Sequence, residues 1–250
     1  ALDREILVSQ QEASKTAIDR ERLRSSLLRS ISHDLRSPLA GIKGTISTIL
    51  EDGESIPENV KQSLLKGVYD DTEWLIRLVE NLLSMTRFDE GNVRIDENME
   101  LVEEVLTESA QRSSKYFRDH EIKIDAPEEM IMAPMDGSLI EQVLINLIDN
   151  AAKFSPKGSL IQVKAYGKDN DVFFEVIDDG IGIDDKILPY IFDRFFTNGS
   201  KISDSRRGVG LGLAICKSIV EAHGGKIAAF NRKNGGSIFR FNIPGKKVID

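Results

Sequence analysis

Apolar residues recur every three or four positions through two long stretches in the first third of the chain, which is the spacing of an amphipathic α-helix. In the first stretch, from about residue 22 to 50, they are Leu28, Ile31, Leu35, Leu39, Ile42, Ile46 and Ile49. In the second, from about 58 to 90, they are Leu64, Val68, Leu75, Leu78, Leu82 and Met85, interrupted at Asp71. The segment EDGESIPEN separates the two, and Gly91 supplies a left-handed stop. The pattern predicts an antiparallel helical hairpin.

Two helices alone leave much of their apolar seams exposed. We therefore expect a second copy of the chain to complete a four-helix bundle, which makes the protein a homodimer. Residues 1–24 are rich in Glu, Gln, Arg, Lys and Ala and read as a solvated linker helix. This helix begins without a cap, so we expect a further segment upstream of it.

After about residue 95 the period changes to short β-rich runs bounded by Gly, Asn, Asp and Pro. They are EIKID, LIQVKAY, DVFFEVID, KIAAF and SIFRFNI, and they are interleaved with helical patterns at 98–119, 136–153 and 210–223. This predicts a mixed α/β layer separate from the hairpin. The expected parts are thus a linker at 1–24, a helical hairpin at 25–92 and an α/β domain at 93–250.

The composition narrows the function. A net charge of −8 and a pI near 5.1 disfavour a nucleic-acid surface, which needs clustered Lys and Arg to replace counterions. The sequence has no apolar run long enough for a membrane span and no signal-peptide pattern. The one cysteine, Cys216, lies in the apolar stretch LAICKSIV and is expected to be a buried structural thiol in a reducing compartment.

The first candidate for chemistry is His33, in ISHDLRSPLAG within the first helical pattern. A lone exposed His is more often a plain surface residue, yet a neutral imidazole can attack phosphorus. Pro38 should kink the helix about one turn back, close to His33. Asp34 could accept or orient the ring proton only if that kink or a special rotamer turns it toward its neighbour.

The second candidate is the segment LIEQVLINLIDNAAKFS. Its apolar residues form a core stripe, and Gln142, Asn146, Asn150 and Lys153 line the opposite side. The Asn pair offers neutral oxygen ligands to a hard cation such as Mg²⁺, and Lys153 can meet a phosphate. A merely solvated polar face is the alternative.

Two glycine-rich turns follow. In VFFEVIDDGIGI a strand runs into Asp178, Gly180 and Gly182, an arrangement that suits a planar base, although a Gly-rich turn alone is weak evidence. In RRGVGLGLAICKSIV three glycines lead into an apolar helix and could expose backbone N–H groups to a phosphate. No Gly-Lys-Ser/Thr follows, so this is not a P-loop. The polar segment TNGSKISDSRR between them reads as a lid over a nucleotide or as an ordinary surface loop.

Taken in order, these motifs resemble those of the histidine kinase family over roughly residues 22–245. SHDLRSPL resembles the phosphoacceptor box, NLIDNAAKFS the Asn box, DDGIGI and GVGLGL the two glycine boxes, and IFDRFF (191–196) the Phe box. The segment RERLRSSLLRSISHDLRSPL is similar in particular to KdpD-like membrane sensor kinases that control potassium uptake. The resemblance implies an all-α dimerisation hairpin plus an α/β sandwich ATP-binding domain of the Bergerat (GHKL) type.

The resemblance also implies the roles of individual residues. His33 would be the phosphoacceptor, Asp34 its general base, and Asn146 and Asn150 the residues at Mg²⁺. The implied ATP-binding residues are Asn146, Asn150, Lys153, Asp178, Gly180, Gly182, Arg206, Gly208, Gly210 and Gly212, with Asp178 at the adenine amino group. The implied partner is the receiver domain of a response regulator. The chain would then be the cytoplasmic portion of a membrane-anchored sensor, with the membrane reached only through an upstream region.

One departure from the family concerns Ser37. Family members carry Thr four residues after the His, where its hydroxyl positions water for dephosphorylating the partner; Ser37 keeps the hydroxyl and loses the methyl group that restricts rotation. Phosphatase activity is thus a weaker expectation than kinase activity. Two rival functions stay open. One is an ATPase of the gyrase and chaperone kind, which is disfavoured because those enzymes carry a Glu that activates water where this chain has Asn146. The other is a dimeric scaffold that binds nucleotide without turnover.

Overall fold

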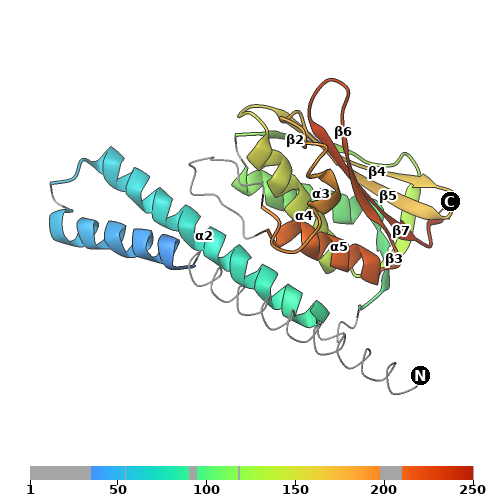
Figure 1. The fold of residues 1–250 in the computed structure, drawn as a ribbon, viewed down its shortest axis with the longest axis horizontal. Helices are drawn as coiled ribbons and strands as arrows, with labels where there is room; N and C mark the ends of the chain where they lie inside the picture. The colour runs from blue at the N-terminus through green and yellow to red at the C-terminus, as the bar shows by residue number, and fades with distance from the viewer. Residues whose placement is uncertain (1–34, 54, 90–94, 118, 198–209, 250) are drawn as a thin grey trace, which may run out of the picture. The chain divides into compact units, whose positions relative to one another are not determined.

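The computed structural model describes residues 35–53, 55–89, 95–117, 119–197 and 210–249. The chain forms two compact units, Ala1–Glu80 and Asn81–Asp250 (Figure 1). Among the described residues, no helix is long and apolar enough to cross a membrane.

The first unit contains a helical hairpin. Residues 35–52 form its first helix, and α2 (Glu58–Asp89) begins after the turn. A Cβ atom at Gly53 would lie 2.2 Å from the carbonyl oxygen of Ile49, so only glycine, which has no Cβ, fits where the chain leaves the first helix. The hairpin agrees with the sequence pattern from residue 35 onward. The expected linker helix at 1–24, the start of the first helix and the kink before Pro38 lie outside the described residues.

Two apolar stripes run along α2, although the sequence spacing pointed to only one. The expected seam at Leu64, Val68, Leu75, Leu78 and Leu82 is half-buried or buried. A second stripe, displaced by one position, stays largely exposed and consists of Leu65, Tyr69, Ile76, Val79 and Leu83. Asp71, which interrupts the seam, faces the first helix: a Cβ at Gly41 would lie 3.5 Å from its Oδ2 atom. Desolvation, and secondly the charge of Asp70, raises the pKa of Asp71.

The second unit is built on a five-stranded sheet with the order β2–β4–β5–β7–β6. These strands are β2 (Glu121–Asp125), β4 (Leu160–Lys168), β5 (Asp171–Ile177), β6 (Ile227–Asn231) and β7 (Ser237–Pro244). β2 and β4 are parallel, and the other neighbours are antiparallel. All five strands fall on the β-rich runs of the sequence.

A smaller sheet joins β1 (Asn98–Leu101), β3 (Met130–Met135) and β8 (Lys247–Ile249). Here the sequence expectation was wrong, because residues 98–101 form a strand and the helix α3 (Val102–Tyr116) begins only after them. β1 pairs with β3, with Asn98 opposite Met135 and Leu101 opposite Met132. Because β3 is distant in sequence, the local pattern of residues 98–101 does not reveal this pairing. β3 was missed because Pro134, which lacks a backbone donor, argues against a strand.

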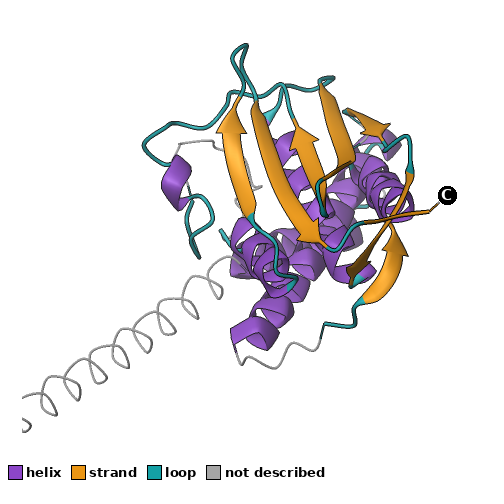
Figure 2. Ribbon diagram, turned by 90° about the vertical axis from the view of Figure 1, so that its right-hand side faces the viewer, coloured by secondary structure: helices purple, strands orange, loops and turns teal. Residues whose placement is uncertain are grey.

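Helices α3, α4 (Gly137–Phe154) and α5 (Gly212–Ala222) cover one face of the larger sheet (Figure 2). A short 3₁₀ helix, η1 (Leu188–Tyr190), lies in the connection after β5. The core between the layers includes the stripe expected on α4, namely Ile140, Val143, Leu144, Leu147, Ile148 and Ala151, all at most 1% exposed. From the sheet, Phe174 and Phe241 stack against each other with ring centroids 4.8 Å apart. This α/β sandwich, together with the hairpin, is the fold expected from the sequence.

Candidate functional site

The C-terminal half of α4 carries the polar side of the Asn motif. Because the apolar stripe of α4 is buried against the sheet, Asn146, Asn150 and Lys153 are turned away from the core. The Nδ2 atom of Asn146 is nevertheless buried, and a hydrogen bond between the Asn146 side chain and the Cys216 thiol partly offsets the rise in the pKa of that thiol. The Lys153 residue as a whole is exposed, yet neighbouring groups desolvate its ammonium enough to lower its pKa. The carboxylate of Asp149 partly offsets this lowering of the pKa.

The start of α5 lies against Asn146. A Cβ atom at Gly212, the first residue of α5, would lie 3.9 Å from both Cγ and Oδ1 of Asn146. No side chain in the described part of the chain caps α5, so the first backbone N–H groups of this helix keep their capacity to bind an anion. This helix start beside Asn146 therefore forms a place suited to negatively charged oxygen atoms.

Asp178, at the end of β5, is held by a network of hydrogen bonds and is 3% exposed. Its Oδ1 atom accepts from the backbone N–H of Gly180 at 2.8 Å and from that of Ser237 at 3.2 Å. Its Oδ2 atom accepts from the Ser237 hydroxyl. The carboxylate is thus fixed in orientation, and Oδ2 retains a lone pair for one further donor.

Gly180 brings the loop after β5 against the end of α4. A Cβ at Gly180 would lie 2.5 Å from the carbonyl oxygen of Phe154, which also accepts from the N–H of Ile181 at 3.4 Å. This contact places the loop directly beside the residue that follows Lys153. The two motifs, 28 residues apart at Asn150 and Asp178, thereby become parts of one surface.

The Phe motif and the second glycine motif also meet. The N–H of Phe195 donates to the carbonyl oxygen of Gly210 at 2.9 Å. Gly210 has a φ of +71°, and a Cβ there would lie 2.6 Å from the carbonyl oxygen of Phe196. Only glycine fits this position without strain.

The structure therefore gathers one group of candidate residues within the second unit: Asn146, Asn150, Lys153, Asp178, Gly180, Gly182, Gly210 and Gly212. His33, Asp34, Arg206 and Gly208 lie outside the described residues. Ser37 is exposed on the first helix of the hairpin. The sequence reasoning missed Ser237, and no sequence signal reveals it, because its partner Asp178 is 59 residues away across the sheet.

Two family models match the chain. The model of the His Kinase A (phospho-acceptor) domain matches residues 23–91, and that of the histidine kinase-, DNA gyrase B- and HSP90-like ATPase matches residues 135–247. The chain belongs to the histidine kinase family. The assignment rests on the presence of both domain matches, in this order, in one chain.

Three similar proteins illustrate the relationship. Sensor protein KdpD of Clostridium acetobutylicum is 72% identical over 244 residues, and that of Escherichia coli is 36% identical over 246. Each alignment covers 98% of this kinase chain and 27% of the relative, so the chain spans about a quarter of those curated proteins. The solved structure of histidine kinase ThkA in complex with response regulator protein TrrA matches with a TM-score of 0.65 and 26% identity, over 90% of this chain and 64% of that one.

The second domain of the kinase is an ATP-binding domain by its family, and the described residues fit that ligand. The start of α5, which no described side chain caps and which lies beside Asn146, suits phosphate oxygens. Among the described residues, no group of three His, Cys, Asp or Glu side chains could hold a metal ion.

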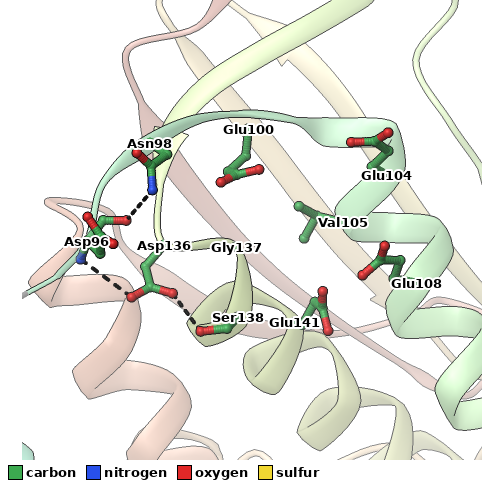
Figure 3. Close-up of a pocket in the computed structure, with 10 residues that line it drawn as sticks. All are labelled: Asp96, Asn98, Glu100, Glu104, Val105, Glu108, Asp136, Gly137, Ser138 and Glu141. Carbon is green, nitrogen blue, oxygen red and sulfur yellow. Dashed lines mark hydrogen bonds between the residues drawn. The ribbon is translucent and has the colours of Figure 1, made fainter.

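A cavity of about 350 Å³ lies at the other end of α4 in the kinase (Figure 3). Its lining includes six carboxylates, from Asp96, Glu100, Glu104, Glu108, Asp136 and Glu141. Asp136 caps α4 by accepting from the N–H of Leu139 at 3.2 Å. At a rise of 1.5 Å per residue, Ser138 at this cavity is about 18 Å along the helix from Asn150. Since its carboxylates repel phosphate groups, this cavity is not the nucleotide site.

Proposed function

We propose that this kinase transfers the γ-phosphoryl group of Mg²⁺-bound ATP to His33 and then passes it to an aspartate of a response regulator. One observation carries the nucleotide part of the proposal: the Asn motif, the uncapped start of α5 and the anchored carboxylate of Asp178 share one surface. The family assignment and the Ser-His-Asp sequence at residues 32–34 support the phosphoacceptor part.

Each residue of the ATP site has a proposed task. The Oδ2 atom of Asp178 accepts a hydrogen bond from the adenine amino group, since it is the carboxylate oxygen with spare capacity. Asn150, with Asn146, supplies neutral oxygen ligands to Mg²⁺. Lys153 binds phosphate. Gly180 and Gly182 let the backbone approach the base, and the segment from Arg206 through Gly208 and Gly210 to Gly212 encloses the phosphates.

The proposed transfer uses residues of the hairpin. An unprotonated ring nitrogen of His33 attacks the γ-phosphorus, and the bond from that phosphorus to the oxygen of the departing ADP breaks. Asp34 takes up the ring proton. Ser37, which follows His33 by four residues in the sequence and is exposed, positions water for the separate task of dephosphorylating the regulator.

The exposed second stripe of α2 supports the proposed homodimer. Leu65, Tyr69 and Ile76 are 47%, 61% and 48% exposed, which is costly for apolar side chains on one helix face. A four-helix bundle formed with a second copy would cover them. In this proposal residues 1–24 link the hairpin to an upstream, membrane-anchored sensor, residues 25–92 form the dimerisation and phosphotransfer domain, and residues 93–250 form the ATP-binding domain.

The test uses the chain with ATP labelled at the γ-phosphate. The wild type is expected to become labelled in a form that acid removes and base preserves, and His33→Gln is expected to take up no label while still binding nucleotide. Acid-stable label on Ser, Thr or Tyr would overturn the assignment of His33. Free phosphate without labelled protein would favour the ATPase, and neither product would favour a scaffold. Transfer of label to a receiver domain tests the second step.

A further inference from the structure

The end of β6 holds the loop that follows Asp178. The side-chain Oδ1 of Asn231 accepts from the N–H of Ile183 at 2.8 Å, and its Nδ2 donates to the carbonyl oxygen of Ile183 at 2.6 Å. The same Nδ2 donates to the carboxylate of Asp185 at 3.2 Å. One amide group therefore pairs with both backbone groups of a residue 48 positions earlier in the chain.

The next residue, Arg232, holds the beginning of the same loop. Its Nη1 atom donates to the carbonyl oxygen of Asp178 at 2.8 Å and also pairs with the carboxylate of Asp179. Behind these contacts, the turn between β6 and β7 approaches the loop through its backbone. A Cβ at Gly236 would lie only 2.0 Å from the carbonyl oxygen of Asp178.

Packing contributes little to the position of this loop. Ile181, between the two glycines, is 80% exposed, and the side chain of Asp179 is 52% exposed. The loop's other apolar side chain, Ile183, is only half-buried, so the loop depends mainly on hydrogen bonds for its position. Gly182 itself approaches Asn231 so closely that a Cβ there would lie 3.1 Å from the Oδ1 atom.

We propose that Asn231 and Arg232 are positioning residues for base recognition: they hold the backbone of residues 178–185 where the adenine ring is received. This inference rests on the proposed nucleotide site at Asp178. Neither side chain touches the base. Each acts by setting the distance between the glycines of the loop and the fixed carboxylate of Asp178.

The experiment measures nucleotide binding to the whole chain by calorimetry, with ATP and with GTP in the presence of Mg²⁺. Asn231→Ala removes the amide that pairs with Ile183. Asn234→Ala is the matched control, because Asn234 is an exposed residue of the same type in the turn that follows Asn231. Asp178→Asn tests the base site independently.

Loss of the three exposed hydrogen bonds of the Asn231 side chain should raise the Kd for ATP about tenfold in Asn231→Ala. The preference for ATP over GTP should shrink with it, while the rate of autophosphorylation at saturating ATP should stay near that of the wild type. Amide hydrogen exchange should become faster at residues 179–185. Asn234→Ala should change none of these.

The outcomes separate this inference from the proposed function. If Asp178→Asn weakens ATP binding while Asn231→Ala behaves like Asn234→Ala, the positioning role is wrong and the base site stands. If Asn231→Ala weakens ATP and GTP equally and lowers the stability of the domain, the contact is only structural, and the inference is again wrong. If Asp178→Asn leaves both titrations unchanged, the site is misplaced and the inference falls with it.

Discussion

Replacing Asp178 with Asn changes one acceptor atom into a donor, and the structure determines which one. The Oδ1 position accepts two backbone N–H groups, from Gly180 and Ser237, so the amide oxygen of the variant must occupy it. The amide nitrogen then takes the Oδ2 position, beside the Ser237 hydroxyl, which can rotate to accept. The fold around the site is retained, and the base meets a hydrogen-bond donor where the wild type offers an acceptor.

The expected loss follows from the type of bond removed. A hydrogen bond to a charged acceptor contributes about 1.5–3 kcal/mol, so Asp178→Asn should weaken ATP binding about ten- to hundredfold. GTP should be affected less, because guanine carries an acceptor oxygen where adenine carries its amino group. The preference for ATP over GTP is therefore expected to narrow.

Calorimetric titration of both nucleotides measures this prediction, with urea unfolding as the control for stability. Ser237→Ala is the companion variant, since it removes the donor to Oδ2 and leaves the acceptor. Ser237→Ala should reduce the stability of the domain without narrowing the preference for ATP over GTP. An Asp178→Asn protein that binds ATP as tightly as the wild type would refute the reasoning.

Four further predictions concern other parts of the chain. Ser37→Ala should slow dephosphorylation of the response regulator and leave autophosphorylation largely intact; equal loss of both rates in one preparation would assign Ser37 only to helix geometry. Ile76→Glu should place a charge in the exposed stripe of α2 and give a molar mass near 27.9 kDa by light scattering, against twice that value for a wild-type dimer. Burial raises the pKa of the Cys216 thiol to about 12, so a disulfide reagent at about pH 8 should react with one thiol per chain only after denaturation. Burial, reinforced by a hydrogen bond with Glu108 and opposed by Arg112, raises the pKa of Glu141 above its ordinary 4.5. Because the folded state holds this proton more tightly than the unfolded state, protonation of Glu141 stabilises the fold fully below about pH 4.5, and the stabilisation is lost as pH rises through the raised pKa. The free energy of unfolding in urea should show this decline with pH in the wild type and lack it in Glu141→Gln.

Much of the site was predictable because its signals are local. The polar side of α4 follows from helical periodicity alone, since the buried stripe fixes which residues face away from the core. Asp178 and its glycines follow from a β-rich run that ends in a turn. The side-chain partners of that loop were not predictable, because Asn231, Arg232 and Ser237 reach it across strands that are far apart in sequence.

The three strands of the smaller sheet show the same limit in the fold. β1 has four residues and β8 has three, too few for a periodic pattern, and β3 contains Pro134. Each is stabilised by its neighbours rather than by its own composition. Residues 98–101 looked helical because their pattern runs into that of α3, and only the pairing with β3 makes them a strand.

The sequence by itself determined the helical hairpin from residue 35 onward, the five strands of the larger sheet and the buried stripe of α4, because each is written in a repeat of two or of three to four residues. Tertiary structure decided which strands are neighbours and therefore which side chains meet. Antiparallel pairing of β5 with β7 sets Ile177 opposite Ile238 and so brings Ser237 to Asp178, while β6 beside β7 brings Asn231 to Ile183. Register between distant strands depends on the whole sheet, and no local pattern of residues contains it.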